Sequence, residues 1–130
     1  MVHVPLIIRG PGVPSGQRSP APVSTLDLVP LFDRACDAEL PRSLRGEDIT
    51  RLFANPAGSI REAVFSEIQG RTMVLTVDYK YVHYGDGSAE LYDMVADPRE
   101  LKNLAGDSQY RDAEHHLRGL LVEHWLSNLP

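Results

Sequence analysis

Five histidines, one cysteine and several carboxylates are the side chains of this sequence that could do chemistry. His115 and His116 are neighbours in the chain, so on a helix they would point about 100° apart and cannot form the i, i+4 pair that clamps a metal ion. His124 lies too far along the same helix for His116 and His124 to reach one ion. We therefore expect surface or packing roles for these three histidines, and a partly buried structural role for His83.

Asp27 is the carboxylate that most invites a catalytic interpretation, because carboxylates bind metal ions. It lies, however, where a helix is predicted to begin, and a carboxylate there accepts hydrogen bonds from free backbone amides. Pro30 fixes the same boundary, since proline is tolerated in the first turn of a helix and not further in. We therefore predict that Asp27 is structural, and that Ser24 or Thr25 caps a helix reaching about Asp37.

Length, composition and charge exclude several classes of protein. The 130 residues are 42% hydrophobic and 24% charged, as in an ordinary soluble globular protein. The formal net charge of −5, without a basic cluster, argues against nucleic-acid binding. No apolar run has the ~18 to 20 residues that a membrane span needs. Because Cys36 is the only cysteine, an intramolecular disulfide is excluded and the cellular compartment stays undetermined.

The chain begins with an apolar segment, Val4 to Ile8, that favours a strand buried on both faces of a parallel or mixed sheet. A strand so near the start has no earlier strand to pair with, so we expect the chain to continue a larger protein. If the preceding part is absent, the open edge predicts self-association through residues 4–8. A loop rich in Gly and Pro, from Gly10 to Pro22, then leads to the predicted helix. The apolar residues of that helix predict a buried stripe: Leu28, Leu31, Phe32 and Ala35.

The second half of the sequence predicts a four-stranded antiparallel sheet. Runs of β type cover residues 61–68, 71–77, 79–83 and 89–94, with chain reversals at Gln69-Gly70 and at Gly85-Asp86-Gly87-Ser88. Before the sheet, a short helix is expected within residues 47–55. After it, a helix from about Ser108 to Leu126 should pack on one face of the sheet, with Trp125 covering the rim.

The segment Asp97-Pro98-Arg99-Glu100 follows the last strand and matches a capping box. Asp97 would be the N-cap, Pro98 the first helical residue, and Glu100 the acidic residue three positions after the cap. We predict a capped turn here, with an architectural role.

Several segments in this order and spacing resemble the C-terminal region of the sulfatase family, within the alkaline-phosphatase-like superfamily. Two are upstream: Val4-Pro5-Leu6-Ile7-Ile8-Arg9-Gly10-Pro11-Gly12 and Ser24-Thr25-Leu26-Asp27-Leu28-Val29-Pro30. The others are Tyr-Lys-Tyr at 79–81, Glu-Leu-Tyr-Asp at 90–93 and Asp-Pro-x-Glu-x-x-Asn-Leu-Ala at 97–105. The residues expected to form this structural motif are Asp27, Pro30, Tyr79, Lys80, Tyr81, Leu91, Tyr92, Asp93, Asp97, Pro98, Glu100, Asn103 and Leu104.

The resemblance implies an α/β fold, which within this chain is α+β. Residues 1–58 would be the end of the main α/β sulfatase domain, and residues 59–130 a C-terminal subdomain with the antiparallel sheet and the long helix. His3 precedes a strand that, in complete relatives, closely follows active-site groups, so it is a candidate for a position near the substrate.

No catalytic residue of the sulfatase family has a counterpart in this chain. The sulfatase nucleophile is a formylglycine made in a Cys/Ser-x-Pro/Ala-x-Arg motif. Cys36 to Leu40 shares the cysteine and Ala38 with this motif, but has Leu40 in place of the arginine. Cys36 would also end a helix, where the helix dipole disfavours an anionic nucleophile. The family's metal-binding Asp-Asp and Asp-Asn or Asp-His pairs have no counterpart here.

We therefore expect the C-terminal part of a sulfuric ester hydrolase, catalytically incomplete as given. The complete enzyme would use a divalent metal, such as calcium, and the partner of this chain would be the missing N-terminal catalytic portion. Two alternatives remain open: the same region of a phosphodiesterase or phosphonate hydrolase, since a fold does not fix its chemistry, and a free-standing interaction module without enzymatic activity.

Overall fold

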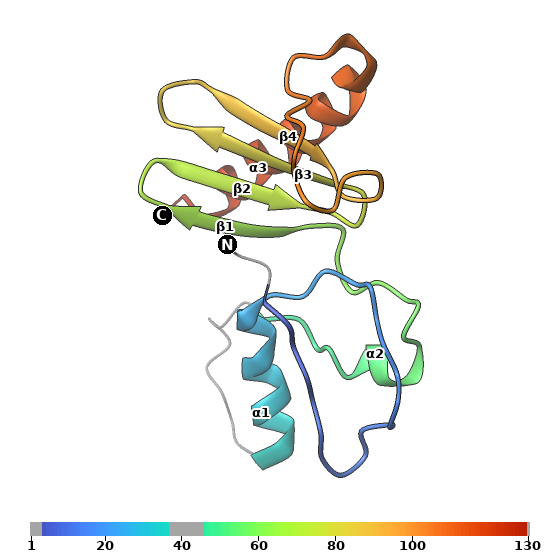
Figure 1. Ribbon diagram of the computed structural model, residues 1–130. Coiled ribbons are helices and arrows are strands. Elements are labelled where there is room, and N and C mark those ends of the chain that lie inside the picture. Colours follow the sequence, from blue (N-terminus) through green and yellow to red (C-terminus); the bar gives the residue numbers. More distant parts are fainter. Residues whose placement is uncertain (1–3, 37–45, 130) are drawn as a thin grey trace. The chain divides into compact units, whose positions relative to one another are not determined.

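The computed structural model describes residues 4–36 and 46–129, which belong to two compact units, residues 1–62 and residues 63–130. Among the described residues, the first unit carries the helices α1 and α2, and the second carries an antiparallel sheet with a long helix (Figure 1). In chain order the elements are η1 Thr25–Asp27, α1 Leu28–Cys36, α2 Arg51–Ala54, β1 Val64–Ile68, β2 Arg71–Leu75, β3 Tyr79–Tyr84, β4 Ala89–Asp93, η2 Ser108–Tyr110 and α3 Arg111–Ser127. The chain thus combines helices with one antiparallel sheet, in the class that the sequence predicts. That the first unit is the end of a larger α/β domain remains a prediction.

The helix in the first unit begins where its capping residues predict. Ser24 is the N-cap, and its hydroxyl accepts a hydrogen bond from the backbone N–H of Leu26. Asp27 completes a capping box, because its carboxylate accepts the backbone N–H of Ser24 at 2.7 Å. Pro30 is the third residue of α1, within the first turn, where a missing backbone donor costs nothing.

Two expectations about the first unit need correction. Residues 4–8 form no strand in the structure, and the side chains of Val4 and Ile7 are 62% and 90% exposed. A strand requires a neighbouring backbone to pair with, and the described part of the first unit contains no strand. The predicted stripe of α1 is also wrong in part, since Phe32 is 60% exposed and Ala35 is exposed too. The first unit alone therefore supplies no cover for these apolar side chains.

The second unit is a meander in which each strand pairs with the next in the order β1-β2-β3-β4. Gly70 and Gly87 lie in the two outer reversals at φ 72° and 87°, a left-handed backbone that costs other residues strain. The register places Phe65, Val74, Tyr81 and Leu91 in one row across all four strands. These predicted strands and reversals are confirmed.

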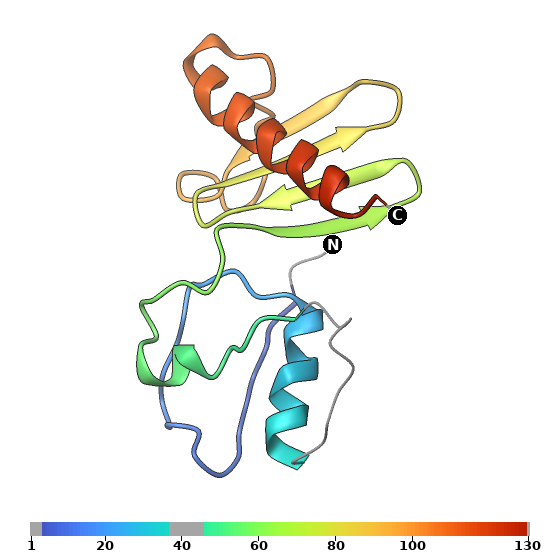
Figure 2. The ribbon, with the colours of Figure 1, turned by 180° about the vertical axis from the view of Figure 1, so that it is seen from behind.

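Helix α3 lies across one face of the sheet (Figure 2). Asp107 caps the preceding η2 turn, since its carboxylate accepts the backbone N–H of Gln109 at 3.0 Å. Leu117 and Leu121, one turn apart, are the buried residues of α3 and pack into the core with the row of sheet residues. Full burial of such side chains stabilises a fold by roughly 1.5 to 3 kcal/mol each. The remaining members of the buried cluster are Ala63, Val74, Tyr81, Leu91 and Leu104.

The capping box predicted at residues 97–100 is wrong. No helix begins there, and Glu100 has a left-handed backbone with φ 58°. The carboxylate of Asp97 accepts the backbone N–H groups of Leu101 and Lys102, at 2.7 and 2.9 Å. These donors lie four and five residues after Asp97, whereas a capping box uses the N–H three residues after the cap. The carboxylate of Glu100 binds Lys80 instead of the backbone N–H of Asp97. The acidic residues therefore hold an irregular turn, and Pro98 lies within that turn.

Candidate functional site

Asp27 is the centre of a buried polar cluster in the first unit. Its side chain is fully buried. Besides the N–H of Ser24, its carboxylate accepts the backbone N–H of Glu47 at 2.7 Å and pairs with the guanidinium of Arg61. Gly46 allows this approach, because a Cβ at position 46 would lie 2.2 Å from the carbonyl oxygen of Leu26. Three donors thus bind one buried carboxylate, as expected for a carboxylate with a structural role.

A second ion pair lies nearby on the first unit. Arg34 of α1 and Asp48 are joined at 2.6 Å, and the hydroxyl of Thr50 donates to Asp48 as well. Burial by itself would raise the pKa of Asp48. Hydrogen bonds from Thr50 and Arg34 outweigh that effect and lower the pKa of this carboxyl.

Cys36 is the last residue of α1 and is exposed. Residues 37–45, with the rest of the candidate nucleophile motif, lie outside the described residues, as does His3. In the described ranges, 4–36 and 46–129, no group of three or more His, Cys, Asp or Glu side chains could hold a metal ion. In the same ranges, no helix has the length and apolarity that crossing a membrane requires.

In the second unit, the residues of the Tyr-Lys-Tyr motif divide between the two faces of the sheet. Tyr81 is buried in the core, and Tyr79 meets Tyr110 edge to face, with ring centres 6.5 Å apart. Lys80 points to the other face, where its Nζ lies 2.5 Å from Glu100 and 5.7 Å above the centre of the Tyr92 ring. Burial, with the nearby Glu90 carboxylate as a further cause, raises the pKa of Tyr92 to about 12. The pair between Lys80 and Glu100 thus ties the sheet to the irregular turn.

Asn103 and Leu104 bind along the free edge of β4. The side-chain oxygen of Asn103 accepts the backbone N–H of Leu91, and its amide nitrogen donates to the carbonyl of Ala89. The N–H of Leu104 donates to the carbonyl of Leu91 at 2.8 Å. Asp93 accepts two further backbone N–H groups at the strand end. The motif residues after the hairpin therefore satisfy backbone groups that an open edge would leave exposed.

The histidines of the second unit have packing or surface positions. His124 stacks on Phe65 with ring centres 4.1 Å apart and contacts the carboxylate of Glu67 at 3.1 Å. His83 meets the indole of Trp125 edge to face at 5.7 Å. His115 is exposed on α3. These positions agree with the roles that the sequence predicts.

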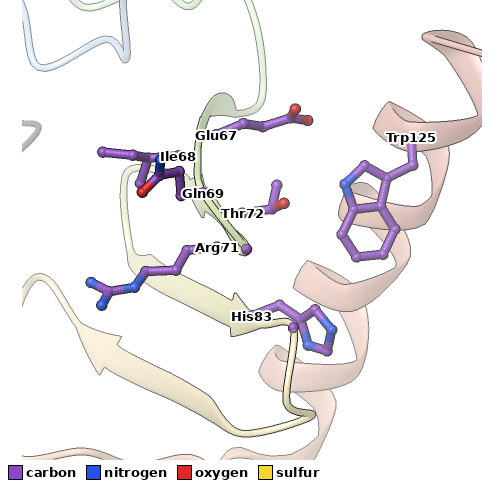
Figure 3. A pocket seen from close by; sticks show the side chains of 9 residues that line it. Glu67, Ile68, Gln69, Arg71, Thr72, His83 and Trp125 are labelled. Carbon is purple, nitrogen blue, oxygen red and sulfur yellow. The ribbon is translucent and has the colours of Figure 1, made fainter.

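A shallow hollow of about 450 Å³ opens beside the turn between β1 and β2. Its walls come from the end of the sheet and from α3. The lining residues are Glu67, Ile68, Gln69, Gly70, Arg71, Thr72, His83, Gly85 and Trp125. Figure 3 shows Glu67, Thr72 and His83 on the side toward Trp125, while Ile68, Gln69 and Arg71 point the other way.

Comparison with known proteins places these features in a family. A family model described as "N-sulphoglucosamine sulphohydrolase, C-terminal" matches residues 1–125. The chain belongs to this sulfatase family. Arylsulfatase K of Mus musculus is 32% identical to it over 120 residues, which make up 80% of this chain and 22% of the mouse protein. This sulfatase C-terminal region thus spans about a fifth of that relative's length.

Solved structures agree with the sulfatase assignment. A protein solved in complex with its substrate D-glucosamine-2-N,6-O-disulfate superposes with a TM-score of 0.66 at 27% identity, covering 80% of this chain and 24% of that one. The phosphonate monoester hydrolase of Agrobacterium radiobacter has a TM-score of 0.62 at 22% identity, covering 79% and 25%. The second likeness shows the fold alone, which is that of the alkaline-phosphatase-like sulfatases.

The separate motifs of this sulfatase region are visible in its sequence, but the contacts between them are not. Arg61, which pairs with Asp27, is 34 residues away in the chain, and no local pattern marks it. The hollow is likewise not visible in the sequence, because its lining residues come from three strands and a helix that are separate in the chain. The one signal available was Trp125, a large aromatic residue expected at the rim of the sheet.

Proposed function

We propose that this chain is the C-terminal portion of a sulfuric ester hydrolase and that it supports the substrate cleft of a catalytic portion which precedes it. The main support is the family match over residues 1–125, combined with a chain that spans 22% to 24% of its relatives. Most of the motif residues have a structural partner: Asp27, Lys80 and Glu100 form ion pairs, Asp93, Asp97 and Asn103 bind backbone groups, and Tyr81, Leu91 and Leu104 are buried in the core. These contacts support an architectural role for the motif.

The chain alone is proposed to be catalytically incomplete. Sulfate ester hydrolysis needs a nucleophile and a cation that stabilises charge on the sulfate oxygens. Cys36 lacks the arginine of the nucleophile motif, since Leu40 stands in its place. The sulfatase family uses a divalent metal, but the described residues offer no fitting set of ligands. Residues of the longer protein that we propose would hold that ion.

A phosphonate or phosphodiester hydrolase is the second candidate, favoured by the shared fold of the Agrobacterium enzyme. The scaffold is common to both chemistries, so the choice depends on groups that precede this chain. A free-standing interaction module is the third. It would be supported if the chain were encoded as a separate protein with no catalytic partner.

The test is to express the chain alone and joined to the coding sequence that precedes it, and to assay both on an aryl sulfate and on an aryl phosphonate. We expect sulfate hydrolysis by the longer protein, lost on chelation, and none by the chain alone. Turnover by the chain alone would contradict its proposed incompleteness. Faster hydrolysis of the phosphonate by the longer protein would select the second candidate.

A further inference from the structure

The hollow beside the β1–β2 turn lies outside the motif residues and combines one large aromatic side chain with several polar ones. Its volume of about 450 Å³ falls within the range of ligand sites. Glu67, Thr72 and His83 are direct cross-strand neighbours on β1, β2 and β3, so three polar side chains form one row on the face that α3 covers. Trp125 lies against the end of this row, with its ring 5.7 Å from His83.

The polar atoms of this row are available to a ligand. Within the described part of the chain, the Thr72 hydroxyl, the ring nitrogens of His83 and the indole N–H of Trp125 make no hydrogen bond to the protein. The carboxylate of Glu67 contacts His124 at 3.1 Å, and one such contact leaves a carboxylate with further acceptor capacity. Gly70 and Gly85 meet at the same end of the sheet, at 2.7 Å between the N–H of Gly85 and the carbonyl of Gly70, and present no side chains that would fill the space.

From this arrangement we propose that the hollow binds an uncharged pyranose ring. Trp125 is 38% exposed, and its indole ring is the flat apolar surface on which the C–H face of a sugar would pack. The row of Glu67, Thr72 and His83 offers acceptors and donors for ring hydroxyls. Aromatic surface with a few fixed polar groups is the usual composition of such sites.

The charges of the hollow select against a sulfate group at this position. The carboxylate of Glu67 is on the same side as Trp125, whereas the guanidinium of Arg71 points away from it (Figure 3). Arg71 instead lies 5.1 Å over the ring of Tyr84 on the other face of the sheet. The ligand is therefore an unsulfated sugar unit. This inference does not depend on the proposed hydrolase activity, because the site belongs to the second unit and is tested in the chain itself.

Trp125 is the only tryptophan of the sequence, so tryptophan emission, excited selectively over the five tyrosines, reports on this hollow. The experiment titrates the chain with N-acetylglucosamine, with N-acetylglucosamine 6-sulfate and with glycerol. We expect a saturable change in emission with N-acetylglucosamine, at a dissociation constant on the order of 1 mM for so small a ligand. The 6-sulfate should bind several-fold more weakly, and glycerol should cause no saturable change.

Thr72→Val is the decisive variant, because it removes one hydroxyl, keeps the side-chain shape and leaves the fluorescent reporter in place. It should weaken binding by about fivefold to tenfold, as expected for one lost hydrogen bond. Thr25→Val is the matched control, since Thr25 is exposed in the first unit, and it should bind as the wild type does. Circular dichroism of both variants checks the fold.

Three results would overturn the proposal: no saturable change with N-acetylglucosamine, equal affinity of the Thr72→Val and Thr25→Val variants, or tighter binding of the 6-sulfate. If Thr72→Val fails to fold, Glu67→Gln replaces it, and unchanged affinity in that variant would count equally against the site. None of these results bears on the hydrolase proposal, which is tested by turnover of the longer protein.

Discussion

At the scale of single residues, the side chains that invite a catalytic interpretation are occupied by structural partners. Asp27 resembles a metal ligand in type, yet its carboxylate is buried and receives two backbone N–H groups and a guanidinium. A buried charge is stable only when it is paired and hydrogen-bonded, and Asp27 meets both conditions. His124 likewise has a stacking partner and a carboxylate partner.

Asp27→Ala should strongly destabilise the first unit. The change removes the acceptor in the capping box and leaves the partly buried Arg61 without its charge partner. We expect a loss of about 2 to 5 kcal/mol in the free energy of unfolding, measured by denaturant titration. The control is Asp78→Ala, an exposed carboxylate, which should change stability by about 0.5 kcal/mol or less. Equal effects of the two substitutions would show that the Asp27 cluster contributes little.

Tyr92 gives a prediction for alkaline pH. Its folded-state pKa of about 12 lies above the ordinary value of 10.0, so the folded chain holds the proton more tightly than the unfolded chain does. The resulting stabilisation is present below pH 10 and is lost as the pH rises toward 12. Phenolate absorbance of the native chain should include a transition near pH 12 that Tyr92→Phe removes. An ionisation midpoint of Tyr92 near pH 10 in the folded protein would contradict this.

At the scale of elements, the hairpin of β3 and β4 is stabilised by the irregular segment that follows it. Asn103 and Leu104 bind the edge of β4, and Glu100 reaches Lys80 on β3. The left-handed backbone at Glu100 is unusual for a residue with a side chain and costs some strain. Its ion pair and the anchored neighbours hold that conformation in place.

Asn103→Ala should loosen this edge. The substitution removes three hydrogen bonds together: the Asn103 side-chain oxygen accepts the backbone N–H groups of Leu91 and Ala105, and its amide nitrogen donates to the carbonyl of Ala89. Because Leu91 is fully buried and its N–H would lose its partner, we expect a cost of about 1 to 3 kcal/mol. Amide hydrogen exchange should show faster exchange at Leu91 in the variant. Lys102→Ala, at an exposed neighbouring position, is the control and should leave both the stability and the exchange rate unchanged.

At the scale of the whole molecule, the apolar segment at residues 4–8 has no sheet partner among the described residues, and Ile7 is almost fully exposed. In the longer protein that we propose, the preceding portion would cover it. In the isolated chain, an exposed apolar backbone segment is a template for pairing with another copy.

We therefore propose that the isolated chain self-associates through residues 4–8. Sedimentation should show association that increases with concentration for the full chain, and a monomer for a variant that begins at Gly10. A Val4→Lys, Ile7→Lys variant of full length should also be monomeric, since it adds charge without shortening the chain. Monomers for the full chain over a wide concentration range would rule out pairing through this segment.

The sequence by itself determined the features that depend on neighbours in the chain. Reversals at Gly70 and Gly87, the cap at Ser24 and the place of Pro30 follow from backbone angles and local hydrogen bonds, and each was predictable. The order of the motifs likewise indicated the sulfatase family before any contact was known. A local signal failed at Asp97, because a capping box and an irregular acidic turn share the same residues.

The tertiary structure decided which distant groups meet. Arg61 pairs with Asp27, which lies 34 residues away in the chain. Glu100 was expected in a capping box, but its carboxylate pairs with Lys80, 20 residues away. The hollow under Trp125 exists only because three strands and α3 bring their ends together. Such contacts depend on how the elements pack, and no residue type or spacing along the chain encodes that packing by itself.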